Sequence, residues 1–205
     1  GRYFGLRNII MGGIGLLFVL LGGYFLDWYI EMFPANNQYH AFHILFGIAI
    51  LFGLISTFLL MKQSEFYKPS PVRYSYRFLF KKPLSNQNFM KLIRFGIFWS
   101  FSFNISAPFF IVFMLHDLKL SYTLVAGYTI TSSCLDLLGM WIWGYISDRT
   151  SNKPVIVISG TILALLPLAW LLVDSNPLSI FFLIPLLHLT AGFFQAGYNL
   201  CSMNL

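Results

Sequence analysis

The side chains best placed to do chemistry in this sequence are polar groups inside long apolar runs. Asp136 lies near the middle of the apolar run Leu124–Ile146. Removal from water disfavours the charged form of a carboxylate, so Asp136 could carry a proton near neutral pH. Two interpretations stay open: a site that couples movement to a proton or another cation, and a polar contact between helices. Ser132 and Ser133, one turn earlier, could hydrogen-bond this carboxyl group.

The last apolar run carries a stripe of polar and small residues. They share one face of a helix, because they are spaced four, three and four positions apart: His188, Gly192, Gln195 and Asn199. An imidazole and two amides can bind hydroxyl or amide groups of a small solute. The stripe therefore predicts the lining of a substrate cavity, and the alternative is that it joins membrane helices.

A further candidate pairs Asn104 with Pro108 in another apolar run. Proline has no N–H to bond the carbonyl group four residues earlier, so it bends the helix at Asn104. Bent helices near the middle of a membrane are common at substrate sites. We therefore expect Asn104 to line the cavity and Pro108 to act as a helix hinge, with binding and gating both open.

Composition places these residues in a membrane. Hydrophobic residues make up 58% of the chain and charged residues 10%, whereas a soluble domain has roughly 25% charged residues. A helix needs about 20 apolar residues to cross the bilayer, and none of the long runs alternates as barrel strands do. The sequence thus predicts an all-α, polytopic membrane protein with six transmembrane helices. The runs are Ile9–Leu26, Ala41–Met61, Phe95–Leu115, Leu124–Ile146, Val155–Val173 and Leu178–Met203.

The cations predict the orientation. If the six runs cross the membrane in turn, 12 of the 13 Lys and Arg residues fall on one side, and Lys119 alone falls on the other. Cations are retained on the cytoplasmic side during insertion, so the N-terminal end of this chain is expected in the cytoplasm. The net charge of +6 then reflects topology and contact with membrane lipids, and no nucleic-acid partner is expected.

A short polar motif separates the fourth and fifth runs: Gly144-Tyr-Ile-Ser-Asp148-Arg149-Thr-Ser-Asn-Lys153-Pro154. It resembles the cytoplasmic loop motif of the major facilitator superfamily, G-x-x-[SA]-D-[RK]-x-[GS]-x-[RK]-[RP]. The resemblance implies a secondary transporter of the plasma membrane (the inner membrane in a bacterium). It also implies that four of these residues form a cytoplasmic gate: Gly144, Asp148, Arg149 and Lys153.

The carboxylate of this motif has two possible partners. A carboxylate can accept from the N-terminal amides of a neighbouring helix, which the superfamily's pseudo-symmetry places near Phe4–Asn8. The alternative is a positively charged turn in which Asp148 caps the helix that begins near Pro154.

The resemblance also implies a register. If the motif is the superfamily's second copy, the chain is a fragment that resembles helices five to ten, a partial form of the fold. Residues 1–61 would be the last two helices of the N-terminal bundle, 62–94 a basic cytoplasmic linker, and 95–205 the first four helices of the C-terminal bundle. The missing helices of the full-length chain would be needed to complete the cavity.

These patterns predict transport of a small solute by alternating access, with or without proton coupling, and leave symport and antiport open. A non-transporting sensor or assembly factor on the same fold is the alternative. An enzyme is not expected, because Asp136 and His188 are the only strongly polar catalytic types deep inside the runs, and no Ser/Lys, paired-Asp or His-rich metal motif accompanies them. No cofactor or metal is expected either, since His40 and His43 have a ligand-like spacing but no third ligand nearby.

Overall fold

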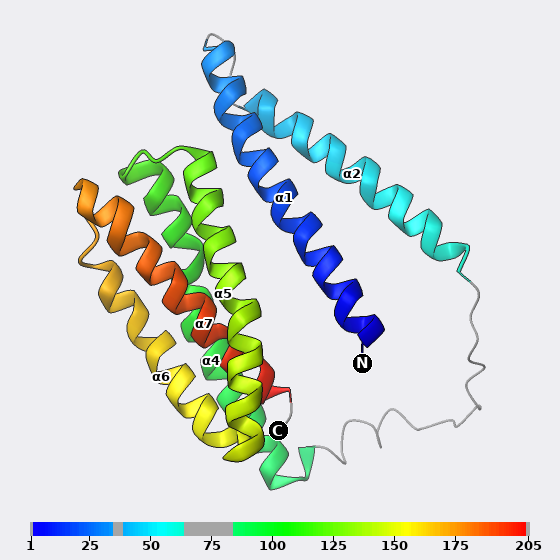
Figure 1. Cartoon of the computed structure of the whole chain (residues 1–205), viewed down its shortest axis with the longest axis vertical. Coiled ribbons are helices and arrows are strands. Elements are labelled where there is room, and N and C mark those ends of the chain that lie inside the picture. The colour runs from blue at the N-terminus through cyan, green and yellow to red at the C-terminus, as the bar shows by residue number, and fades with distance from the viewer. Residues whose placement is uncertain (1, 35–38, 64–83, 204–205) are drawn as a thin grey trace. The chain divides into compact units, whose positions relative to one another are not determined.

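The computed structural model describes residues 2–34, 39–63 and 84–203, with side chains from residue 10 onward. This part of the chain is helical and contains no strand, which confirms the all-α prediction (Figure 1). The π-helical segments η1 and η2 continue directly into or out of α-helices. In chain order the elements are α1 (Arg2–Met32), α2 (Tyr39–Met61), α4 (Gln87–Val112), η1 (Phe113–Asp117), α5 (Tyr122–Arg149), α6 (Asn152–Trp170), η2 (Ser179–Leu183) and α7 (Ile184–Ser202).

All six predicted helices are present. Five stretches are long and apolar enough to cross a membrane, and they coincide with five of the predicted runs: Ile10–Met32, Tyr39–Met61, Gln87–Asp117, Asn152–Trp170 and Ser179–Ser202. The sixth, α5, is long enough at 28 residues but more polar than the others. Its middle turns contain Thr129, Thr131, Ser132, Ser133 and Asp136, so a polar surface is built into this helix.

The helices form two compact units, Gly1–Ala41 with Ser106–Leu205, and Phe42–Ile105. The boundary between them falls inside α4, three residues before Pro108. Most side chains of α2 in the second unit are exposed, as expected of a helix that faces lipid. Residues 64–83 of the predicted linker lie outside the described residues, and the predicted division at 61 and 94 stays a prediction.

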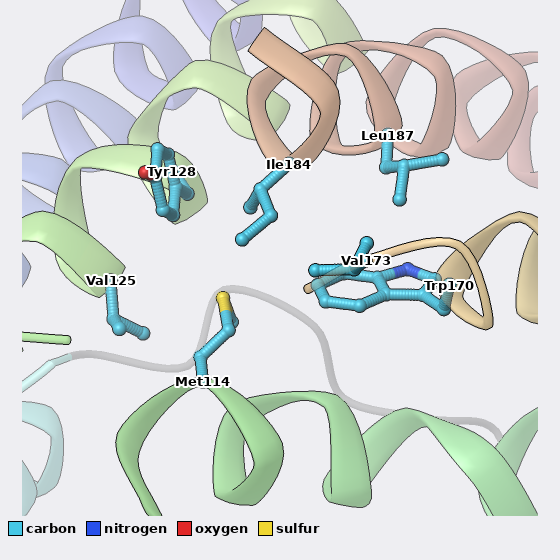
Figure 2. Packing of buried hydrophobic residues seen from close by; sticks show 7 residues of the cluster. All are labelled: Met114, Val125, Tyr128, Trp170, Val173, Ile184 and Leu187. Atoms are coloured by element: carbon cyan, nitrogen blue, oxygen red, sulfur yellow. The ribbon is translucent and has the colours of Figure 1, made fainter. Parts of the chain in front are cut away.

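The core of the first unit lies where η1, α5, α6 and α7 meet. Figure 2 shows its side chains pointing toward one another: Met114, Val125, Tyr128, Trp170, Val173, Ile184 and Leu187. Phe110 of α4 stacks on Trp170 with ring centroids 4.6 Å apart. The Tyr128 hydroxyl donates to the carbonyl oxygen of Ile180 at 2.7 Å, which satisfies a polar group that would be costly to bury alone. The core therefore joins these elements at one end of the unit.

Candidate functional site

The helices α5 and α7 approach each other closely at two glycines. A Cβ added to Gly192 of α7 would collide with the backbone of Ser132. A Cβ added to Gly139 of α5 would lie 2.9 Å from the Cβ of Ala196 and from the carbonyl oxygen of Phe193. Small residues let membrane helices approach closely, so the two backbones meet along a narrow contact.

Asp136 lies on the face of α5 that forms this contact, four residues after Ser132 and three before Gly139. Its Oδ1 atom is buried and has no hydrogen-bond partner among the described residues. The prediction that Ser133 would bond it is wrong, because the Ser133 hydroxyl donates to the carbonyl oxygen of Thr129 at 3.0 Å. Both interpretations of Asp136, the coupling site and the polar contact between helices, stay predictions.

His188 of α7 lies beside the core described above. Its ring centroid is 5.5 Å from that of Tyr128 and 5.7 Å from that of Trp170. Its Nδ1 atom is 3.0 Å from the carbonyl oxygen of Ile184, one turn earlier. His188 is thus half-buried among aromatic rings, with one ring nitrogen already occupied by its own helix.

The two amides of the stripe bond to each other. Gln195 donates from Nε2 to Oδ1 of Asn199 at 2.9 Å, and both side chains are half-buried. The side-chain oxygen of Gln195 and the side-chain nitrogen of Asn199 remain able to bond other partners. The stripe therefore has two parts: His188 and Gly192 contact neighbouring helices, and the amide pair keeps hydrogen-bonding capacity. Cavity lining by these residues stays a prediction.

Asn104 and Pro108 both lie in α4, on either side of the boundary between the units. Asn104 is exposed and donates from Nδ2 to the carbonyl oxygen of Ser100 at 2.8 Å. It belongs to the second unit, so its place beside the α7 stripe stays a prediction. The helix continues through Pro108 to Val112. The hinge at Pro108 stays a prediction.

The gate motif lies at the end of α5 opposite to Tyr122. Gly144, Asp148 and Arg149 are still helical, the turn is only Thr150 and Ser151, and Lys153 lies in the first turn of α6. The Arg149 guanidinium lies over the Tyr145 ring, 4.2 Å from its centroid. The predicted partner of Asp148, near Phe4–Asn8, lies where the side chains fall outside the described residues. The cytoplasmic gate stays a prediction.

One polar contact was not predicted. The carboxylate of Asp27, near the end of α1, accepts from the backbone N–H of Tyr122 at 2.9 Å and of Thr123 at 2.7 Å. The first turn of α5 contains no acidic residue of its own, and helix N-termini attract carboxylates. The sequence therefore shows that the first turn of α5 has no acidic residue. It does not show that Asp27 of α1 accepts the hydrogen bonds of that turn.

The described residues offer no set of ligands for a metal ion. Within the ranges that the structure describes, no three His, Cys, Asp or Glu side chains gather closely enough to hold an ion. Cys134 and Cys201 are free thiols.

Long apolar helices, a polar α5 and a buried carboxyl group define a class, the polytopic α-helical membrane proteins. The whole chain, residues 1–205, matches the family model of the Major Facilitator Superfamily. The chain therefore belongs to this superfamily, a family of membrane transporters, and the resemblance predicted from its motif is confirmed. No curated protein and no solved structure matched the chain.

Proposed function

We propose that this chain is the central part of a secondary carrier that moves a small solute by alternating access and couples that movement to a proton through Asp136. The observation that carries the proposal is the buried Oδ1 atom of Asp136, which has no hydrogen-bond partner among the described residues. An ionised carboxylate in such a place is costly, and a protonated one is far less so. A group of this kind favours binding a proton in one state of the carrier and releasing it in another.

The solute is proposed to bind near the amides of Gln195 and Asn199. They lie on the same face of α7 as Gly192, which touches α5 four residues before Asp136. A solute that displaced the Gln195–Asn199 bond could recover it with its own hydroxyl or amide groups. His188 and Asn104 are proposed as further contacts, and Pro108 as the hinge of α4.

The test uses the protein as its gene encodes it, reconstituted into vesicles that enclose a pH-sensitive dye. Sugars, amino acids, nucleosides and organic cations are screened for uptake driven by an imposed pH gradient. We expect at least one class to accumulate with proton movement. The Asp136→Asn variant should lose accumulation against a gradient, by tenfold or more, and keep exchange of solute between the two sides.

Asp117→Asn is the matched control, because Asp117 is an exposed carboxylate outside the α5–α7 contact. It should accumulate solute as the wild type does. Accumulation that survives in Asp136→Asn would show that Asp136 is not the coupling group. The absence of any flux or exchange across the whole panel would instead favour a sensor or assembly factor.

A further inference from the structure

We propose that Asp27 holds α1 and α5 together on the side of the membrane opposite to the gate motif, and that this contact must break for the carrier to open on that side. The inference rests on the proposed function, because it assigns the contact to the transport cycle. In the predicted orientation this is the non-cytoplasmic side.

The start of α5 depends on Asp27 for its hydrogen bonds. The amides of a first helical turn have no partner within their own helix. Here the amides of Tyr122 and Thr123 donate to the two carboxylate oxygens of Asp27. Ser121 accepts from the next two, with its hydroxyl from Leu124 at 3.2 Å and with its carbonyl oxygen from Val125 at 3.1 Å. Half of this cap therefore comes from a residue 95 positions away in the chain.

The backbones of α1 and α5 meet at the same end. A Cβ on Gly23 would lie 2.8 Å from the carbonyl oxygen of Tyr122 and 3.1 Å from the Cβ of Ala126. Gly23 and Leu26 are both buried, in a helix whose other apolar side chains are mostly exposed. The approach that brings Asp27 within hydrogen-bond distance of α5 is thus possible because position 23 has no side chain.

The opposite half of α1 makes no such approach. A Cβ on Gly12, Gly13 or Gly15 would meet nothing within 4 Å among the described residues, and Leu17 and Phe18 are more than half exposed. The two helices are therefore joined near Asp27 and separate toward the N-terminal end of α1 (Figure 1). This is the arrangement of a carrier that is closed on the Asp27 side.

α1 and α5 lie in the same compact unit of this structure, whereas the predicted division of the chain assigns them to different bundles. A contact between them is therefore remade in each transport cycle if the bundles rock. Charge-assisted hydrogen bonds in partly buried places stabilise one state strongly, and Asp27 makes two of them. Their loss shifts the population toward the state that is open on this side.

The test measures the distance between α1 and the connection before α7 by spin labels at Met32→Cys and Leu178→Cys, both exposed positions. It uses the full-length protein in a background without native cysteines, and it needs no solute. Asp27→Asn should increase the ratio of long to short distances about tenfold. Glu31→Gln, an exposed acid one turn further along α1, should leave the distance distribution unchanged.

A second pair of variants acts from the other helix. Tyr122 is the first residue of α5, and Ser121 before it is extended (φ −67°, ψ 151°), so proline is tolerated at position 122. Tyr122→Pro removes one of the two donors to Asp27, whereas Tyr122→Ala removes the side chain and keeps the N–H. The proline variant should show more of the long distance than the alanine variant.

Identical distributions for Asp27→Asn and the wild type, or for Tyr122→Pro and Tyr122→Ala, would overturn the inference and leave Asp27 as a helix cap. If Asp27→Asn fails to fold, the comparison of Tyr122→Pro with Tyr122→Ala decides whether the inference holds. A distance shift in a protein that moves no solute would support the contact and contradict the proposed function.

Discussion

Asp174 shows how a single side chain orders a connection outside the membrane. It lies between α6 and η2, where its Oδ1 atom accepts from the Ser179 hydroxyl at 2.5 Å and from the Asn176 N–H at 3.1 Å. These bonds lower the pKa of Asp174 below its ordinary value of 3.8, and the bond from Ser179 is the largest cause. The carboxylate form therefore holds the two ends of the turn together.

The first prediction concerns Ser179→Ala, which should raise the pKa of Asp174 toward its ordinary value. A lowered pKa stabilises the folded state above the unfolded-state pKa, and this contribution is lost as the pH falls through the folded-state pKa. Near pH 7 the variant should therefore melt at a lower temperature than the wild type. This difference in melting temperature should narrow below about pH 3. Melting temperatures across this range provide the measurement.

Ser175→Ala is the control for this prediction, because Ser175 is exposed in the same connection. It should melt with the wild type at every pH. A difference in melting temperature between Ser179→Ala and the wild type that stays constant from pH 7 to about pH 2 would mean that the hydroxyl acts by packing, since Ser179 is itself buried.

At the residue scale, unusual polar side chains can be recognised in the sequence more readily than the atoms to which they hydrogen-bond. Asp136 and the gate motif could be recognised because polar residues inside apolar runs, or at a fixed spacing, are unusual. The Ser133 hydroxyl bonds its own helix, as Ser and Thr often do, and this choice depends on a rotamer. The partner of Asp27 depends on how α1 packs on α5, which no local pattern specifies.

At the scale of elements, the apolar runs predicted the existence of the helices better than their ends. The helix predicted from Leu124–Ile146 extends to Tyr122 and Arg149, because polar residues continue a helix into the membrane surface. The segments η1 and η2 were not predicted, since single π-helical turns leave no hydrophobic pattern of their own. The α5–α7 contact was not predicted either, since Gly192 was assigned to a face that lines a cavity and instead lies against Ser132.

The second prediction tests that contact with two glycines. Gly192→Ala places a methyl group against the backbone of Ser132, whereas Gly127→Ala on α5 meets nothing within 4 Å. Overpacking of a tight contact costs about 1 to 3 kcal/mol, so Gly192→Ala should lower the free energy of unfolding in detergent by that amount. Gly127→Ala should leave it unchanged or raise it slightly. Equal stability of the two variants would show that α7 can move away from α5 without cost.

At the scale of the whole molecule, the orientation follows from charge rather than from packing. Arg149 and Lys153 lie at one end of the α5–α6 pair, and Asp174 lies at the other end of α6. The packing of the helices would be the same whichever end faced the cytoplasm, so the orientation is inferred from the retention of cations on the cytoplasmic side. The Asp27 contact takes its side of the membrane from the same argument.

The last prediction tests this orientation with cysteines at two exposed positions, Ser151 and Leu178. In intact cells, a membrane-impermeant thiol reagent should label Leu178→Cys and leave Ser151→Cys unlabelled, because the cation-rich turn is retained inside. Both should react after permeabilisation, which shows that protection comes from the membrane and not from burial. Labelling of Ser151→Cys but not of Leu178→Cys in intact cells would show that the predicted orientation is inverted. The Asp27 contact would then close the cytoplasmic side, and the gate motif would face outward.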